Sequence, residues 1–255
     1  MQWQTKCGIM GSVESAEPRL TVVVPCRSVT QQLEDLLETL LAASCEIVVV
    51  QAQHESDLPM EPCGPSGYTD QGVCWLFAAA SRGSQIATGI AHTRADLIWV
   101  LHADSQDIDE SLAFLLELGR SERAVWGRFD IRLEGSHPGL LAVAWAMNWR
   151  SRLTRICTGD QSIFFHRSML QGIGGFPAQP LMEDIELCKR LKRLTPRSDF
   201  LASTIRVSTS GQRWQRYGFF GTVLAMWKWR LRYFFGASPQ RLFQEYYRDQ
   251  PRAKR

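Results

Sequence analysis

The architecture of this chain can be read from residues 20–50, LTVVVPCRSVTQQLEDLLETLLAASCEIVVV, and extended from there. The stretch opens with a continuous, largely β-branched run over residues 20–25, which is typical of a strand buried on both faces. Leucines at helical spacing follow over residues 31–42, and a second buried run covers residues 46–50. This order predicts a βαβ unit whose two strands are parallel and whose crossover is right-handed.

Strands and helices continue to alternate along the chain. We expect a surface loop over residues 51–70, and further strands over 97–101, 125–133 and 162–165. Helices are expected over residues 76–92, 109–118, 138–156, 184–194, 214–235 and 239–247. The predicted fold class is α/β, an open and mostly parallel Rossmann-like sheet flanked by helices, with C-terminal helices. In such sheets ligands bind outside the carboxyl ends of the strands.

The composition is that of an ordinary globular protein, because 45% of the 255 residues are hydrophobic and 22% are charged. We expect one main domain over residues 19–236, preceded by a mobile leader (1–18) and followed by a C-terminal helix and basic tail (237–255). The longest strongly apolar stretch, residues 219–227, is about half of the ~20 residues needed to cross a bilayer, so no integral span is expected. Seven scattered cysteines without a C-x-x-C pair predict reduced thiols in a cytoplasmic protein and no structural zinc site.

The charge is divided unevenly along the chain. Residues 1–188 carry 13 Lys and Arg against 23 Asp and Glu, whereas residues 189–255 carry 16 against 3. A basic end suggests an anionic partner: a phosphate-bearing substrate, an acidic lipid surface or nucleic acid. Nucleic acid is rejected because no recognised binding motif is present. For the last residues, 248–255, a solvated basic tail is the preferred reading.

The segment LHADS, residues 101–105, is the strongest local signal for chemistry. The carboxylate of Asp104, at the end of a buried strand, could hold a divalent ion that bridges the two phosphates of a nucleotide-sugar. It could equally cap the following turn or helix. Upstream, Arg82 could contact phosphate and Gln85 a base or sugar, although each is also an ordinary polar residue for a helix surface.

Two adjacent acids, Glu183 and Asp184, open a basic helix. The helix macrodipole favours an ionised carboxylate there, which could accept a proton from a hydroxyl group. The competing interpretation is a simple N-cap.

Two other polar pairs have the same ambiguity. Asp160 and Gln161 precede a short strand and are either site residues or part of a polar turn. Arg213 and Trp214 are suited to binding phosphate and stacking on a sugar, or to starting an anchored helix.

The order of these motifs resembles the family-2 glycosyltransferases of GT-A fold, and most closely the small bacterial branch of the arsenosugar-biosynthesis type. The resemblance covers residues 20–240, and its most specific parts are T-G-D-Q and P-L-M-E-D-I-E-L. The motifs that carry it are V-V-P (23–25), R-x-x-Q (82–85), LHADS (101–105), W-G-R-F-D (126–130), T-G-D-Q (158–161), G-G-F-P (174–177), P-L-M-E-D-I-E-L (180–187) and Arg213-Trp214.

The resemblance implies transfer of a sugar from a nucleotide-sugar to a hydroxyl acceptor, with inversion and with help from Mn²⁺ or Mg²⁺. Asp104 matches the last acid of the family's D-x-D motif, the metal position, and Asp184 matches the catalytic base. Donor nucleotide binding is implied for Pro25, Arg27, Gln51, Arg82, Gln85, His102 and Asp104. Contact with the acceptor or the diphosphate is implied for Asp160, Gln161, Glu183, Arg213 and Trp214.

Three positions depart from the family pattern. Gln51 stands where the family places Asp, Ala87 stands where Asn is frequent, and His102 replaces the first acid of D-x-D, as is common in this branch. Two alternatives therefore stay open: a nucleotidyltransferase on the same sheet, or a degenerate, non-catalytic binder of sugar-nucleotides.

The acceptor is expected to be a small molecule or a lipid-linked molecule. Residues 217–235 interleave aromatic and basic side chains, as helices lying in a bilayer interface do. This suggests peripheral contact with the inner face of the membrane. Because the charges alternate too closely to leave one clean polar face, a helix packed against the protein is the favoured alternative.

Overall fold

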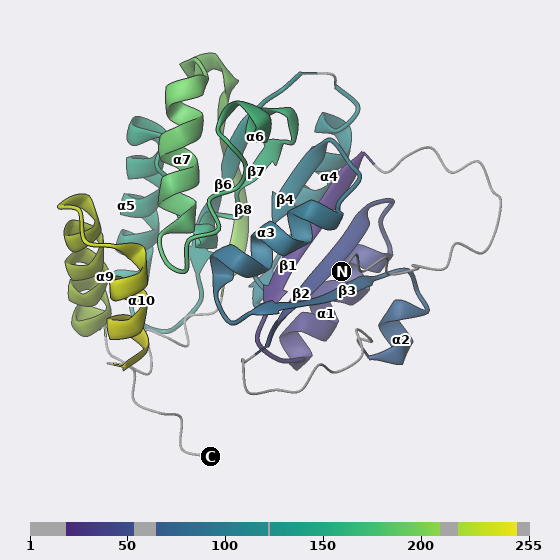
Figure 1. The fold of residues 1–255 in the computed structure, drawn as a ribbon, viewed down its shortest axis with the longest axis horizontal. Helices are drawn as coiled ribbons and strands as arrows, with labels where there is room; N and C mark the ends of the chain where they lie inside the picture. Colours follow the sequence, from purple (N-terminus) through teal and green to yellow (C-terminus); the bar gives the residue numbers. More distant parts are fainter. Residues whose placement is uncertain (1–18, 54–64, 122, 210–218, 249–255) are drawn as a thin grey trace, which may run out of the picture.

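The computed structural model describes residues 19–53, 65–121, 123–209 and 219–248 (Figure 1). The expected leader, residues 1–18, lies outside the described residues, as do Arg213, Trp214 and the tail after residue 248.

The described residues form an eight-stranded sheet in the order β3-β2-β1-β4-β7-β6-β8-β5. The strands are β1 Leu20–Cys26, β2 Glu46–Gln53, β3 Cys74–Ala79, β4 Leu97–Val100, β5 Ser105–Gln106, β6 Trp126–Leu133, β7 Phe164–His166 and β8 Phe200–Thr209. The helices are α1 Gln31–Leu41, α2 Ser66–Thr69, α3 Arg82–His92, α4 Asp109–Leu118, α5 Gly139–Thr154, α6 Ser168–Gly172, α7 Glu183–Leu194, α9 Phe219–Phe234 and α10 Pro239–Arg248, with 3₁₀ turns η1 Gly159–Gln161 and η2 Arg197–Asp199.

The first half of the sheet is the parallel βαβ arrangement expected from the sequence. β1 pairs in parallel with β2 and β4, and β2 pairs in parallel with β3. Alternate residues of β1 enter two different cores, since Val22 and Val24 pack with the leucines of α1 whereas Val23 packs with Ile86 and Ile90 of α3. Helices therefore cover both faces of the sheet, which explains why its strands are continuously apolar.

The second half of the sheet is mixed. β7 is antiparallel to both β4 and β6, β6 is parallel to β8, and β5 is antiparallel to β8. Four of the seven pairings are thus parallel. The predicted open α/β sheet flanked by helices is confirmed.

Two parts of the predicted element pattern were wrong. The helix expected over 76–92 is a strand, β3, followed by helix α3, which starts at Arg82 after Ser81 caps it by accepting the Ser84 N–H at 3.2 Å. A short apolar run can form either a strand or a buried turn of helix, so the spacing of apolar residues in this segment did not show that a strand precedes the helix. Strand β8 was not expected, because six of its ten residues are half-buried or exposed and it has no continuous apolar run.

The C-terminal helices α9 and α10 pack against each other at the lower left of Figure 1. The Trp229 and Tyr246 rings meet edge to face with centroids 6.0 Å apart, and Arg232 pairs with Glu245. Within the described ranges, no helix is both long and apolar enough to cross a membrane.

Candidate active site

The turn η1, with the sequence T-G-D-Q, is fixed to helix α5 by one buried side chain. Gln161 donates from Nε2 to Asn148 Oδ1 at 3.2 Å and to Ser151 Oγ at 3.0 Å, and its Oε1 accepts the Thr158 N–H at 3.3 Å. Gln161 is 0% exposed. Its expected contact with acceptor or diphosphate is therefore corrected to an anchoring role, which holds Gly159 and Asp160 in place.

Asp184 lies in the first turn of α7 and faces this anchored turn. Its Oδ2 accepts the Gly159 N–H at 2.8 Å, and its Oδ1 accepts the Ile185 N–H at 2.7 Å. The residue before the helix, Met182, has φ 64°, a left-handed conformation that is uncommon for a side chain of this size. Strained backbone and two hydrogen bonds together orient the carboxylate.

Two guanidinium groups lie near the Asp184 carboxylate. Burial lowers the pKa of Arg150 to about 10, the charge of Arg230 lowers it further, and Asp184 opposes the shift. Burial also lowers the pKa of Arg230, again opposed by Asp184. Helices α5 and α9 thus bring two partly desolvated cations to an anion at a helix N-terminus, where the macrodipole also favours negative charge.

Glu183, the neighbour of Asp184, points in a different direction. It is 4% exposed, and its Oε1 lies 3.8 Å from Arg82 Nε. Burial and the negative charge of Asp184 raise its pKa to about 7, and Arg82 offsets part of the rise. Glu183 is thus a buried acid paired with the first residue of α3.

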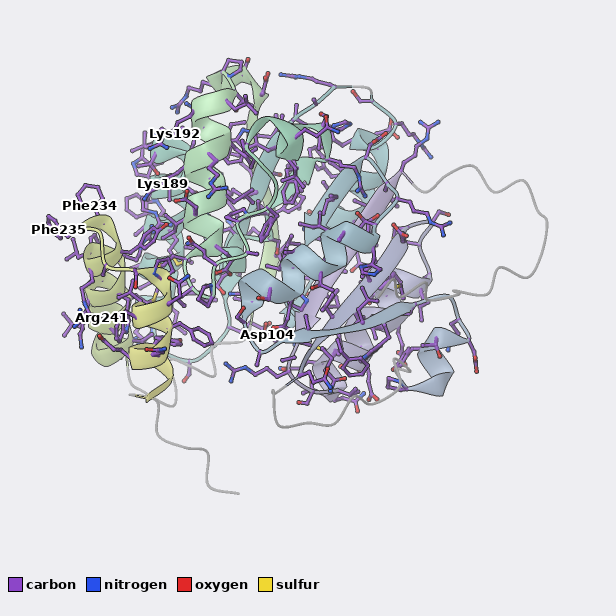
Figure 2. The ribbon with its side chains drawn as sticks, viewed as in Figure 1. Asp104, Lys189, Lys192, Phe234, Phe235 and Arg241 are labelled. Carbon is purple, nitrogen blue, oxygen red and sulfur yellow. The ribbon has the colours of Figure 1, made fainter. Side chains whose placement is uncertain are left out.

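His102, Asp104 and Asp160 meet at the carboxyl end of β4. His102 Nδ1 lies 3.3 Å from Asp160 Oδ1 and 3.9 Å from Asp104 Oδ1, and both carboxylate side chains are 40% exposed. A Cβ on Gly159 would lie 2.8 Å from His102 Nε2 and 3.2 Å from Arg82 Cζ. A larger residue at this position would therefore require the His102 ring and the Arg82 guanidinium to shift away from η1. In Figure 2, Asp104 lies below α3 and to the right of α10.

The side chains around Asp104 offer few ligands of their own to a divalent cation. Within the parts of the chain that the structure describes, no three or more His, Cys, Asp and Glu side chains converge on one point. Asp104, with Asp160 nearby, offers one or two partly exposed carboxylates. This set fits a cation such as Mg²⁺ or Mn²⁺ that takes its remaining ligands from substrate phosphates.

A cavity of about 450 Å³ lies between Asp160 and Asp184 on one side and the C-terminal helices on the other, and Asp104 and His102 lie outside its lining. This is within the usual size of a small-molecule site. One wall carries Asp160 and Asp184, and the other carries Lys228 and Arg230 of α9, with Arg82 also in the lining. Trp229 and Tyr246 add aromatic surface. The cavity therefore sets carboxylates opposite cations.

The wall formed by α9 and α10 was largely missed by sequence reasoning. Lys228, Trp229 and Arg230 stood out only as members of an aromatic and basic stretch, and Tyr246 did not stand out at all. The excess of positive charge after residue 188 was the one signal that pointed to an anionic ligand at this end of the chain.

The expected donor-side residues at the ends of β1 and β2 lie outside the lining of this cavity. Pro25 is paired with Val50 in the sheet, and Gln51 Oε1 accepts a hydrogen bond from Trp75 Nε1 at 3.2 Å. Arg27 is exposed just beyond β1. Gln85 is buried.

The Gln85 side chain joins the two strand ends. Its Nε2 donates at 2.7 Å to both Cys26 O and Val50 O. These bonds use the Nε2 group of Gln85, and its expected contact with base or sugar stays a prediction.

No protein-family model matches the chain, and no curated protein matches it. Among solved structures it is similar to S. aureus TarS 1-349 in complex with UDP-GlcNAc, with 13% identity and a TM-score of 0.55 over 75% of this chain and 58% of that chain. The same protein in complex with UDP gives 13% identity and a TM-score of 0.51, over 75% and 60% of the two chains. Glucosyl-3-phosphoglycerate synthase from Mycobacterium tuberculosis, in complex with Mn²⁺, UDP and glucosyl-3-phosphoglycerate, gives 13% identity over 75% and 71%, but its TM-score of 0.47 is too low to establish a shared fold.

The chain matches less than two thirds of the length of the TarS structures. At these identities the likeness establishes the fold alone. The mixed sheet with helices on both faces is the GT-A fold, as the sequence resemblance led us to expect.

Proposed function

We propose that this chain is a glycosyltransferase that moves a sugar from a nucleotide-sugar to an acceptor hydroxyl, with inversion at the anomeric carbon. The observation that carries the proposal is one cavity in which the fixed carboxylate of Asp184 faces the cations of α9. Support comes from TarS, which has a similar fold and was solved with UDP-GlcNAc and with UDP. The order of the motifs supports the finer assignment to family 2 and its arsenosugar-biosynthesis branch.

Asp184 is the proposed general base. The acceptor oxygen forms a bond to the anomeric carbon, the bond from that carbon to the diphosphate breaks, and the hydroxyl proton passes to the Asp184 carboxylate. The Gly159 N–H holds Oδ2 of this carboxylate, so the group does not have to reorient during the reaction. The guanidinium groups of Arg150 and Arg230 lie near this carboxylate and place positive charge beside it.

The leaving diphosphate is assigned to the region of Asp104 and Asp160. These carboxylates would hold the divalent cation together with the diphosphate, and the bound cation would neutralise charge on the leaving group. Arg82 and Arg230, in the cavity lining, supply fixed positive charge for the same purpose. His102 lies beside both acids and positions them. Pro25, Arg27 and Gln51 stay proposed contacts of the nucleotide.

A cytoplasmic location is part of the proposal. It is supported by the free thiols of the cysteines that the structure describes: Cys26, Cys45, Cys74, Cys157 and Cys188.

The test compares Asp184→Asn with wild type and with Glu186→Gln, an acid on the same helix that bonds to Arg190 and Tyr233. Each protein is incubated with UDP-sugars, Mn²⁺ and a panel of acceptors, and release of nucleoside diphosphate is measured. We expect Asp184→Asn to lose roughly 10²–10⁴-fold in turnover while UDP still raises its melting temperature, and Glu186→Gln to stay near wild type.

Three outcomes would overturn the proposal. Wild-type turnover in Asp184→Asn would show that Asp184 is not the general base. Release of pyrophosphate identifies a nucleotidyltransferase. Stabilisation by UDP-sugar with no product from any acceptor identifies a non-catalytic binder.

A further inference from the structure

Helix α5 exposes a continuous apolar row. Leu141, Trp145, Trp149 and Leu153 recur every four residues, so they lie on one face of the helix. Their exposed fractions are 52–72%. The Trp145 and Trp149 rings stack with centroids 6.4 Å apart and an interplanar angle of 3°. The opposite face of α5 packs on β6, so this row points outward.

Helix α9 exposes a second apolar row, and its other face lines the cavity. Thr222 and Trp229 are buried toward the cavity. The outer side chains are 47–81% exposed. In Figure 2, Phe234 and Phe235 project from the left edge of the molecule. The full outer row is Leu224, Trp227, Leu231, Phe234 and Phe235.

The two rows belong to neighbouring helices. Figure 1 shows α9 below α5 on the same side of the molecule, and the charges of Arg150 on α5 and Arg230 on α9 interact. Of the eleven large apolar side chains that are exposed in the described residues, nine belong to these two rows. Single exposed apolar residues are normal, but such a concentration marks an interaction surface. We call the two rows together the α5–α9 face.

The charges of α5 and α9 indicate which partner fits this face. Neither helix contains Asp or Glu, and together they carry five cations. Two of these, Arg152 and Arg232, also pair with Asp130 and Glu245. Lys228 is exposed, and its Nζ lies 4.9 Å from the centroid of the Trp229 ring. The remaining two cations, Arg150 and Arg230, are largely buried near Asp184 and do not contribute to this face.

Tryptophan and phenylalanine beside arginine and lysine, with no carboxylate on either helix, match the chemistry of an anionic lipid surface. The rings enter the boundary of the acyl chains, and the exposed Lys228, together with the partly exposed Arg152 and Arg232, meets the phosphates of the headgroups. We propose that the α5–α9 face docks on an anionic bilayer. This docking does not depend on the proposed function, although the outer face of α9 is only one helix thickness, roughly 10 Å, from its cavity side.

The test is flotation of the full chain with vesicles of phosphatidylcholine alone and of phosphatidylcholine with phosphatidylglycerol, at low and high salt. We expect binding to the anionic vesicles only, weakened by salt. A variant with Trp145→Gln, Trp149→Gln, Trp227→Gln and Phe234→Gln should bind the anionic vesicles at least roughly tenfold more weakly, because it loses most of the apolar surface that inserts. The matched control is Val29→Gln with Leu194→Gln, the two exposed large apolar residues outside the face.

The fold of each variant is checked by circular dichroism and thermal unfolding, since the replaced side chains are exposed. The proposal is overturned if the wild-type protein does not bind anionic vesicles. It is also overturned if the four-residue variant binds them as tightly as the wild type and the control do. Sedimentation equilibrium supplies a further outcome: a wild-type dimer that the variant abolishes, without vesicle binding, would identify a second copy of the chain as the occupant.

Discussion

Glu183 offers a quantitative test of the electrostatics at the start of α7. Burial, together with the charge of Asp184, raises its pKa from 4.5 to about 7, although Arg82 lies 3.8 Å away. Between these values the native protein binds more protons than the unfolded chain. The stability that the protonated group contributes is therefore complete below about pH 4.5 and is lost as the pH rises to about 7. At 1.36 kcal/mol per pKa unit, the loss is at most ~3 kcal/mol.

The perturbation is Glu183→Gln, which keeps the shape of the side chain and removes its titration. Unfolding free energies of variant and wild type are measured by urea denaturation at pH values from about 5 to 8. We expect the unfolding free energy of the variant, relative to that of wild type, to rise by about 1.4 kcal/mol per pH unit up to pH ~7. Above pH ~7 the difference between the two proteins should stay constant.

The control for this experiment is Glu186→Gln on the same helix. Burial would raise the pKa of Glu186, but hydrogen bonds from Arg190 and Tyr233 outweigh it, so that pKa is lowered. Glu186 is ionised throughout the pH range of the experiment, and its variant should differ from wild type by the same amount at every pH. A pH-independent difference for Glu183→Gln would refute the reasoning about burial.

Three further predictions concern the turn and the cation position. Gly159→Ala places a Cβ 2.8 Å from His102 Nε2, so we expect kcat/KM for the donor to fall by about 10²-fold with the fold intact by circular dichroism; unchanged kinetics would contradict the close approach. Gln161→Leu leaves the Thr158 N–H without its acceptor and removes the donor to Ser151 Oγ and Asn148 Oδ1, although Asn148 Oδ1 keeps the Ile131 N–H; urea denaturation should show a loss of about 1–3 kcal/mol in unfolding free energy, and a smaller loss would contradict the anchoring role. UDP should raise the melting temperature of Asp104→Asn as much as that of wild type, but adding Mn²⁺ together with UDP should give no further rise in the variant. A Mn²⁺ effect as large as in wild type would contradict the cation assignment.

The parallel half of the fold could be predicted because its physical signal is local. Strands covered by helices on both faces must be apolar at every position, so the runs at residues 20–25, 46–50 and 97–101 are visible in the sequence. Strand β8 has no such signal, because only its first residue and its last three residues are buried. Its place beside β6 depends on pairing between segments about 70 residues apart, which no local pattern encodes.

The second wall of the cavity could not be predicted for a similar reason. Lys228, Arg230 and Tyr246 line the same cavity as Asp184 because α9 packs against α7, where the Tyr233 hydroxyl donates to Glu186, and α10 packs against α9. Spacing within α9 indicates which side chains share a face, but the helix it packs against is decided by tertiary contacts. The sequence could therefore indicate an anionic ligand for the basic end without indicating where that ligand binds.

In two of the motifs, adjacent polar residues have different roles: one is buried and affects the stability of the fold, and the other lines the cavity. In the turn, Gln161 is buried and bonded to α5 whereas Asp160 lines the cavity. At the start of α7, Glu183 is buried against Arg82 whereas Asp184 lines the cavity. Neighbours on a helix point about 100° apart, so the two members of such a pair can face different surroundings, as they do here. Substituting the buried member of each pair should therefore mainly change the unfolding free energy, whereas substituting the member that lines the cavity should mainly lower turnover. The sequence motif alone does not distinguish the two residues.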